Sequence, residues 1–294
     1  MNEDLELIPI DTKLKIKNII RVFIRHIKIY WAYLKIRFLN EIQYKAAALA
    51  GIITQFAWGG MYIMLYSTFL QNGTSSDYTI SQMCSYVWLQ QGTIMLYSMS
   101  SIDKDILRHC ETGQIAMELV KPIDLYSIWH AKTLGKKIAS SILRLIPIVV
   151  ICSMPFMGEF KLMPPVSAKA FILFIITLIL SVGVMMAYTM LMYITATKNI
   201  TSQGVKSTYR IIMEACSGSI IPIAFMPNTV VNVLKCTPFY YMQNVAFNIY
   251  NGYLTDNFEI VRIVVLQIIW IFVLTIIGKR MLNKELNKVI VQGG

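Results

Sequence analysis

Few residues of the chain combine the types and the spacing that chemistry needs. The three histidines, His26, His109 and His130, are far apart and match no metal-ligand spacing. The segment Gly135-Lys136-Lys137 ends like a phosphate-binding loop, but it lacks the upstream glycine and the final hydroxyl residue of such a loop. No Ser-His-Asp arrangement stands out. The sequence therefore predicts a chain that is not an enzyme and that binds no cofactor or metal itself.

Two charged residues, Arg144 and Glu214, lie inside long apolar stretches. Each is about five or six residues from one end of its stretch, which is roughly 8–9 Å at 1.5 Å per helical residue. An isolated charge in hydrocarbon is costly, and opposite charges at one depth tend to pair. The sequence predicts an Arg144–Glu214 pair, within one subunit or across a dimer. The alternative is that Arg144 extends its guanidinium toward the lipid headgroups.

The composition explains why chemistry-bearing residues are few. Of the 294 residues, 56% are hydrophobic and 15% are charged, whereas soluble domains average roughly 45–50% and about 25%. One soluble core of this size cannot bury so much apolar surface. Five scattered cysteines, an odd number, also argue against a secreted disulfide scaffold. The sequence excludes an ordinary soluble enzyme and predicts an integral membrane protein.

Six stretches reach the roughly 20 apolar residues with which a helix crosses about 30 Å of hydrocarbon. They cover approximately residues 46–70, 83–101, 138–157, 169–194, 209–226 and 260–280. Long, continuous apolar runs favour helices over the alternating strands of a membrane barrel. The expected organisation is an N-terminal segment 1–45, a six-span domain 46–280 and a C-terminal tail 281–294.

The distribution of basic residues predicts the orientation of these spans. The N-terminal segment, the 102–137 loop and the segments after spans four and six hold 22 lysines and arginines, whereas the opposite side holds four. Cytoplasmic loops carry such an excess of basic residues. Both termini are therefore expected in the cytoplasm.

The N-terminal segment predicts an amphipathic helix over residues 13–37. Lys13, Lys17, Arg21, Arg25 and Lys28 recur at spacings of three and four, opposite apolar and aromatic residues. Such a helix lies at the membrane surface against anionic headgroups. It either fixes the topology only or also touches a cytoplasmic partner. Nucleic-acid binding is not expected, because the basic residues already have a membrane role.

The 102–137 loop is the longest expected cytoplasmic connection. Gly113 breaks one short helix and Pro122 starts or interrupts another. Ile115, Met117 and Leu119 between them form an apolar surface that is too short to span a membrane. This surface packs either on the ends of the chain's own spans or on a partner.

Two segments resemble a known family, the ABC-2-type permeases, which are membrane subunits of ATP-binding-cassette exporters. The first is the pattern Glu111-x-Gly113-x-x-x-x-x-Leu119-x-Lys121-Pro122-Ile123-Asp124. The second begins at Ser217-Gly218-Ser219, passes through Pro227, Leu234 and Thr237-Pro238-Phe239, and ends at Ile249-Tyr250-Asn251-Gly252. The order of a Ser-Gly-rich fifth span, an apolar run to proline, a Pro-Phe element and a glycine before span six is similar to that in the family.

The resemblance implies roles for both segments. The first would carry a coupling helix that sits in a groove of a cytoplasmic ATPase subunit, with Glu111, Gly113, Leu119, Lys121, Pro122 and Asp124 as coupling residues. The second would form short extracellular re-entrant helices before the last span, unless it is an ordinary extracellular loop. The expected fold class is thus an all-α integral membrane protein with six transmembrane helices, an N-terminal amphipathic interfacial helix, a coupling helix and re-entrant helices.

The resemblance also implies a function and a location. The chain would be the permease subunit of an exporter of a drug, peptide, lipid or other amphipathic substrate in a bacterial cell membrane. ATP and Mg would bind the ATPase subunit, and a second copy or a related permease would complete a dimer among membrane lipids. The translocation path between spans two and five would involve Tyr86, Trp88, Met95, Tyr97, Met213, Gly218 and Phe225. Such aromatic and methionine residues also serve simple packing.

One alternative of a different class stays open, an ion-coupled secondary transporter or channel. Such a protein is expected to show ionisable residues near the membrane midplane or inverted internal repeats. No repeat stands out, and Arg144 and Glu214 lie near one membrane face. The exporter interpretation is therefore preferred.

Overall fold

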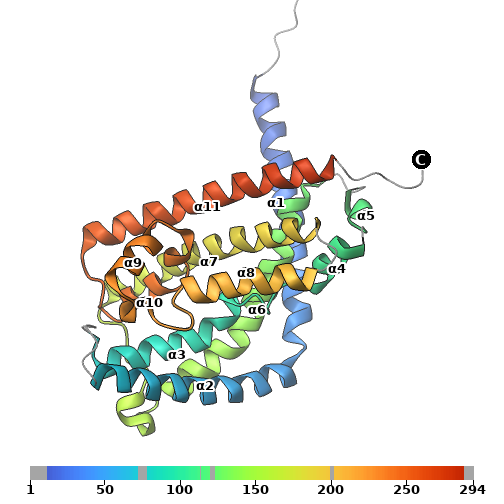
Figure 1. The fold of residues 1–294 in the computed structure, drawn as a ribbon. Helices are drawn as coiled ribbons and strands as arrows, with labels where there is room; N and C mark the ends of the chain where they lie inside the picture. The colour runs from blue at the N-terminus through green and yellow to red at the C-terminus, as the bar shows by residue number, and fades with distance from the viewer. Residues whose placement is uncertain (1–11, 72–77, 113, 120–122, 199–201, 288–294) are drawn as a thin grey trace, which may run out of the picture.

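The computed structural model describes residues 12–71, 78–112, 114–119, 123–198 and 202–287. These residues form helices and no strand (Figure 1). The α-helices are α1 (Thr12–Ile42), α2 (Lys45–Gln71), α3 (Ile80–Tyr97), α4 (Lys104–Thr112), α5 (Ile115–Leu119), α6 (Leu125–Cys152), α7 (Ala168–Ala196), α8 (Ser202–Cys216), α9 (Asn228–Lys235), α10 (Asn244–Tyr250) and α11 (Asn257–Leu286). Three short 3-10 helices are η1 (Pro155–Phe160), η2 (Ile223–Phe225) and η3 (Pro238–Tyr241).

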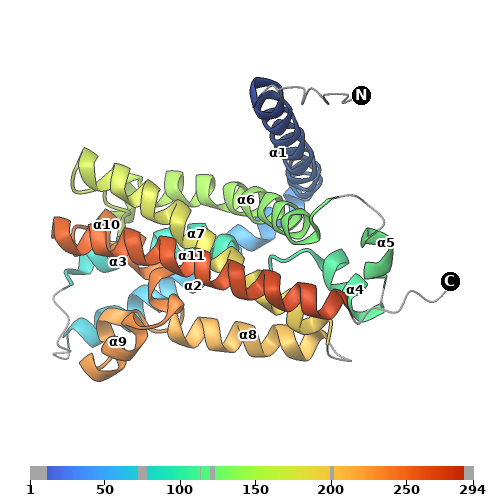
Figure 2. The same cartoon turned by 90° about the horizontal axis from the view of Figure 1, so that it is seen from above.

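The helices α2, α3, α6, α7, α8 and α11 run along the molecule in alternating directions and form a bundle (Figures 1 and 2). In it α3 packs on α2 and α6, while α7 packs on α11 and α8. Helices α4 and α5 lie at one end of the bundle, and α9 and α10 lie at the other. Because the directions alternate, α2 begins and α11 ends at the end that carries α4 and α5.

Three helices of the described chain are long and apolar enough to cross a membrane, namely α2, α7 and α11. They have 27, 29 and 30 residues and coincide with the first, fourth and sixth predicted stretches. The other three bundle helices fall short for visible reasons. Helix α8 has 15 residues, α3 carries several glutamines and serines, and the first half of α6 carries lysines.

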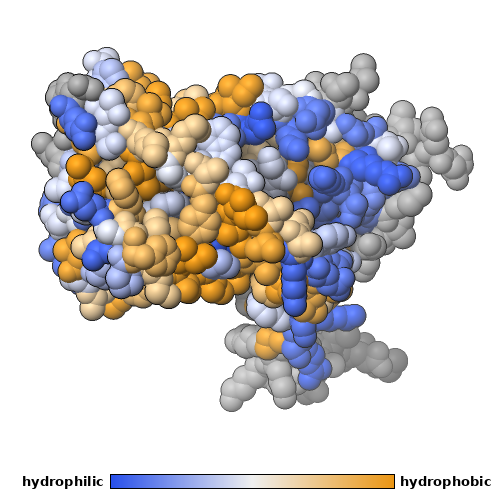
Figure 3. All heavy atoms as spheres, turned by 90° about the horizontal axis from the view of Figure 1, so that it is seen from below, coloured by the Kyte–Doolittle hydropathy of each residue, from blue (hydrophilic) through white to orange (hydrophobic). Residues whose placement is uncertain are grey.

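The surface of the bundle agrees with a membrane environment. Figure 3 shows apolar side chains over the middle of the helices and hydrophilic side chains gathered toward the end where α4 and α5 lie. Large apolar side chains such as Met64 on α2 and Phe272 on α11 are exposed. A soluble monomer rarely exposes so continuous an apolar band. We conclude that the chain is an all-helical membrane protein.

Helix α1 runs across the bundle and projects beyond it (Figures 1 and 2). It packs on α6, and Gly135 allows this close approach. A Cβ atom at Gly135 would lie 2.3 Å from the backbone oxygen of Leu34, which no real contact permits. Other apolar side chains of α1, such as Ile24 and Ile36, stay exposed. The helix therefore has one face on protein and another that is open to its surroundings.

The start of α6 corrects the expected 102–137 loop. Residues 125–137 continue as helix into the predicted third span, and α6 ends at Cys152 rather than at residue 157. Asp124 caps the helix by accepting a hydrogen bond from the Ser127 N–H at 3.1 Å. The buried side chains of Leu125 and Trp129 face protein. Gly135 is tolerated inside α6 because α1 packs against it.

The end of α8 corrects the expected fifth span, 209–226. The helix ends at Cys216, and Gly218 has a φ of 80°, a left-handed conformation that suits glycine. Pro222 then prevents the helix from resuming at once. The Ser217-Gly218-Ser219 segment therefore ends a helix instead of lining its middle.

Smaller differences concern the ends of α3 and α11. Helix α3 ends at Tyr97, before the expected end of the second stretch at residue 101. Helix α11 continues to Leu286, into the expected C-terminal tail 281–294. The segment 228–250, expected to be re-entrant, contains α9, η3 and α10. All residues of α10 are buried, against α3 and α7.

Candidate functional site

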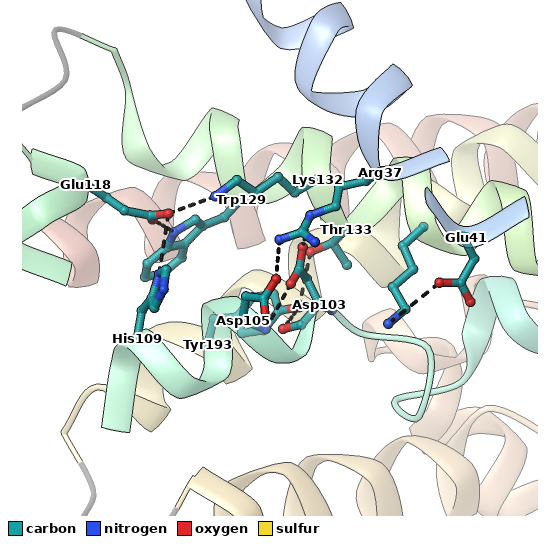
Figure 4. Close-up of polar contacts among 11 residues, drawn as sticks. Arg37, Glu41, Asp103, Asp105, His109, Glu118, Trp129, Lys132, Thr133 and Tyr193 are labelled. Atoms are coloured by element: carbon teal, nitrogen blue, oxygen red, sulfur yellow. Dashed lines mark hydrogen bonds and ion pairs between the residues drawn. The ribbon is translucent and has the colours of Figure 1, made fainter. Parts of the chain in front are cut away.

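A charged cluster joins α1 to the start of α4 (Figure 4). Arg37 of α1 places Nε 2.8 Å from Oδ2 of Asp103 and Nη2 2.6 Å from Oδ2 of Asp105. The backbone N–H of Asp103 donates to the Tyr193 hydroxyl of α7 at 2.8 Å. The same hydroxyl lies 3.1 Å from Oγ1 of Thr133 on α6. Helices α1, α4, α6 and α7 therefore meet at one polar point.

The electrostatics of this cluster favour the charged forms of Arg37 and Asp105. The hydrogen bond from Arg37 lowers the pKa of the Asp105 carboxyl, although partial burial would raise it. Burial would lower the pKa of Arg37, but the neighbouring carboxylates of Asp103 and Asp105 outweigh this effect and raise it. Removing one member of a buried pair leaves an uncompensated charge, which typically costs about 3–5 kcal/mol.

A second cluster holds α5 on α6 around Glu118 (Figure 4). The carboxylate accepts hydrogen bonds from Nζ of Lys132 and Nε1 of Trp129, each at 2.7 Å. Nδ1 of His109 lies 3.5 Å from the carboxylate oxygen that Lys132 contacts. Burial by itself would raise the pKa of Glu118, but the two hydrogen bonds outweigh it and lower the pKa. Glu118 is thus a buried anion with dedicated partners.

The end of α4 is tied to the start of α8. Glu111 accepts hydrogen bonds from the backbone N–H of Ser202, at 3.0 Å, and from the Ser202 hydroxyl. This contact satisfies one of the free N–H groups at a helix N-terminus. On the neighbouring side, Asp124 lies 3.3 Å from Nζ of Lys279 on α11. Helix α4 is therefore joined by side-chain contacts to both α8 and α1.

The structure places the expected coupling residues as follows. Glu111 and Asp124 make the contacts above, and Leu119 at the end of α5 is exposed. Gly113, Lys121 and Pro122 lie outside the described residues. Sequence analysis missed the residues that hold α4 and α5 in place, which are Arg37, Asp103, Asp105, Glu118, Trp129 and Lys132. The charged residues among them can be read from the sequence, but residues that pair are up to 68 positions apart in it.

A cavity of about 240 Å³ lies between α2, α3 and α8. Its lining includes Gln55 of α2, Gln90 and Gln91 of α3, Glu214 of α8 and Gln243. The side-chain oxygens of Gln55, Gln90 and Gln91 are buried and accept no hydrogen bond in the described chain. The described residues that line the cavity include no lysine, arginine or histidine. The cavity inside the helical bundle therefore combines largely apolar walls with several polar side chains.

Two of the expected path residues, Tyr97 and Met213, line this cavity. Trp88 instead donates its indole N–H to the backbone oxygen of Phe160 at 2.7 Å. The Tyr86 hydroxyl lies 3.4 Å from Oδ1 of Asn244.

The remaining path residues lie elsewhere. Met95 is half-buried on α3, Gly218 forms the turn after α8, and Phe225 packs its ring against Tyr66 of α2. The cavity residues Trp58 and Tyr62 of α2 were not expected.

Arg144 and Glu214 form no pair with each other within the described chain. Nη1 of Arg144 donates to the backbone oxygen of Ser140 at 3.4 Å, one turn nearer the start of α6. Glu214 has Oε1 3.9 Å from Nε of Arg210 on its own helix. The Arg144 guanidinium lies against Gly51 of α2, with Nε buried. Extension to the lipid headgroups and a pair across a dimer both stay predictions.

The helical bundle and its apolar surface define the class as an all-α integral membrane protein. Within that class, residues 56–293 match the family described as ABC-2 family transporter protein. Because this match covers most of the chain, the chain belongs to the ABC-2 transporter family, and the resemblance of the sequence motifs is confirmed. The match supports a permease of an ATP-binding-cassette transporter. Among curated proteins, none matches the chain significantly.

Proposed function

We propose that the chain is the membrane-spanning subunit of an ATP-binding-cassette exporter whose ATP is hydrolysed by separate cytoplasmic ATPase subunits. The observation that carries the proposal is the attachment of α4 and α5. Ion pairs and hydrogen bonds join these short helices to α1, α6, α7 and α8 at the polar end of the bundle. A force applied to α4 and α5 by a partner would therefore move several long helices together.

The proposed topology has six spans, formed by α2, α3, α6, α7, α8 and α11. Helix α3 is more polar than a typical membrane span, yet 13 of its 18 residues are buried among other helices. Polar side chains are tolerated at membrane depth where protein covers them. The excess of basic residues supports a cytoplasmic location for α4, α5 and both termini. Helices α9 and α10 then lie on the outer side as re-entrant elements.

The proposed translocation path begins at the cavity between α2, α3 and α8. ATP-driven closure of the ATPase subunits would move α4, and the Glu111–Ser202 contact would carry this movement to α8. A shift of α8 would change the width of the cavity, since Met213 and Glu214 line it. A second copy or a related permease would provide the other half of the path. The substrate class is a drug, peptide, lipid or other amphipathic molecule.

The test uses the exposed apolar side chain at the end of α5. Leu119→Glu adds a charge where the ATPase would dock, at a side chain that is 37% exposed. The chain is purified from its native membranes in mild detergent, and the partners are identified by mass spectrometry. We expect an ATPase with a phosphate-binding loop to accompany the wild-type chain and to be reduced at least about tenfold with Leu119→Glu.

The matched control is Val233→Glu, an exposed apolar position on the short helix α9 at the opposite end of the bundle. It should retain the ATPase. If both variants retained the ATPase equally, the proposed coupling role of α5 would be wrong. A chain that carries no ATPase and instead conducts or exchanges ions in liposomes would favour the ion-coupled transporter or channel.

A further inference from the structure

We propose that the cavity between α2, α3 and α8 binds the protonated amine of an amphipathic substrate, an inference that rests on the proposed path through this cavity. The feature that requires explanation is the set of unpaired acceptors. Gln55, Gln90 and Gln91 are only 8%, 4% and 1% exposed, and their amide oxygens accept no hydrogen bond in the described chain. Native proteins leave few buried polar groups unpaired. All three residues line one cavity but their oxygens have almost no accessible surface in it, so a small rotation of each side chain would bring its oxygen to a ligand that donates hydrogen bonds.

A hydrogen bond within the protein fixes the orientation of the Gln90 side-chain amide. Nε2 of Gln90 donates to the backbone oxygen of Ser219 at 2.8 Å, so its oxygen is the end left without a partner. Nε2 of Gln243 likewise donates to Oγ of Ser219 at 2.8 Å. The amide donors of Gln90 and Gln243 are thus used within the protein, while the oxygens of Gln55, Gln90 and Gln91 remain without a donor. An alkylammonium group has three N–H donors and no acceptor, which complements this arrangement.

The charge and the aromatic lining select a cation. Glu214 supplies a carboxylate, and no basic side chain is among the described lining residues. Trp58, Tyr62 and Tyr97 also line the cavity, and their ring faces attract ammonium groups. Arg210 lies near Glu214 without lining the cavity, so the carboxylate can still face a bound cation. An anionic or purely acceptor-bearing ligand would meet unpaired oxygens and a like charge.

The size and lining favour an organic amine over a metal ion. A cavity of about 240 Å³ is far larger than a dehydrated ion, and apolar Ile94, Met213 and Ile220 form part of its wall. Calcium and magnesium need several oxygen ligands at about 2.0–2.6 Å. In the described residues no group of three His, Cys, Asp or Glu side chains could hold a metal. Trp58 is partly exposed at the bundle surface, so an alkyl tail can enter from the lipid.

The experiment measures binding to the full-length chain alone in nanodiscs of zwitterionic lipid. The probe is radiolabelled dodecylamine at a pH where it is protonated, with dodecanol and dodecanoate as equal-length comparators. We expect saturable binding of dodecylamine, and binding at least about tenfold weaker for dodecanol and dodecanoate. Glu214→Gln and, separately, Gln91→Leu should each weaken dodecylamine binding about tenfold.

Glu259→Gln is the matched control, because Glu259 also sits one helical turn from an arginine, Arg262, but lies away from the cavity. It should bind like the wild type. Because Glu214 is partly exposed, Glu214→Gln keeps the test valid if Gln91→Leu does not fold. Equal binding of dodecylamine and dodecanol, unchanged binding by Glu214→Gln, or displacement of the amine by sodium at the same site would each overturn the proposal. The ATPase co-purification does not depend on this ligand, so the two failures are distinguishable.

Discussion

Glu118 and Lys132 show how single residues hold α5 in place. Their side chains are 7% and 10% exposed, and the anion has a further hydrogen bond from Trp129. Exposed ion pairs contribute about 0–1 kcal/mol, whereas a buried charge that loses its partner costs about 3–5 kcal/mol. The stability of α5 on the bundle should therefore depend on both partners.

Lys132→Met keeps the length of the side chain but leaves the buried Glu118 carboxylate uncompensated. We expect a destabilisation of about 3–5 kcal/mol, measured by denaturant unfolding in detergent. Arg262→Met, which breaks an exposed pair with Glu259, should cost about 0–1 kcal/mol. The double variant Lys132→Met/Glu118→Gln should recover most of the lost stability, since it also removes the carboxylate that Lys132→Met leaves without a partner. Similar losses for the two single variants would contradict the importance of the buried pair.

The same carboxylates predict a pH dependence for α4 and α5. Their partners lower the pKa values of Asp105 and Glu118 below the ordinary 3.8 and 4.5. The stabilisation is therefore complete above the ordinary values and is lost as the pH falls through the lower values of the folded state. We expect amide hydrogen exchange in α4 and α5 to rise as the pH falls below about 4, after correction for the intrinsic rate.

The helix α10 provides the internal control for this measurement, because none of its residues has a carboxylate side chain. Its corrected exchange should stay constant over the same interval. A uniform rise across all helices would indicate global unfolding instead of release of α4 and α5.

At the scale of elements, the contact between α1 and α6 depends on one missing side chain. Gly135→Ala would place a Cβ atom 2.3 Å from the Leu34 backbone oxygen. We expect α1 to be displaced, with a loss of about 1–3 kcal/mol and a lower Tm, because overpacking forces the backbone to shift. The measurement is thermal unfolding together with protease sensitivity of α1.

Gly60→Ala is the matched control in the helix α2, where an added Cβ meets no atom within 4 Å. Alanine has a higher helix propensity than glycine by about 1 kcal/mol, so this change should be neutral or stabilising. If both variants lowered the Tm equally, steric contact with Leu34 would not explain the first result.

At the scale of the whole molecule, cysteine labelling can test the proposed orientation of the chain in the membrane. Cys236, which directly follows α9, is the exposed cysteine among the described residues, whereas Cys216 is half-buried and Cys84, Cys110 and Cys152 are buried. If α9 faces outward, a membrane-impermeant maleimide should label Cys236 on intact cells, and Cys236→Ser should abolish that labelling.

Lys284→Cys at the end of α11, in a Cys236→Ser background, is the comparison for the other side of the membrane. It should react only after the membrane is permeabilised, because α11 ends where α4 and α5 lie. The reverse pattern of labelling would invert the proposed topology and move the coupling segment outside.

The sequence by itself determined the properties that local residues control. Apolar runs long enough for hydrocarbon predicted the helices α2, α7 and α11, and the motifs from Glu111 to Asp124 and from Ser217 to Gly252 predicted the family. Both depend on composition and on the order of nearby residues, which a single chain displays directly.

The tertiary structure alone decided which distant residues meet. Arg37 pairs with Asp103 and Asp105 on a different helix, and Gln55 shares a cavity with Gln90 and Gln91. It also decided that Gly135 lies within α6, because packing of α1 outweighs the low helix propensity of glycine. Periodicity indicates which face of a helix is buried, but the partner of that face depends on how helices far apart in the chain pack, and no local pattern encodes it.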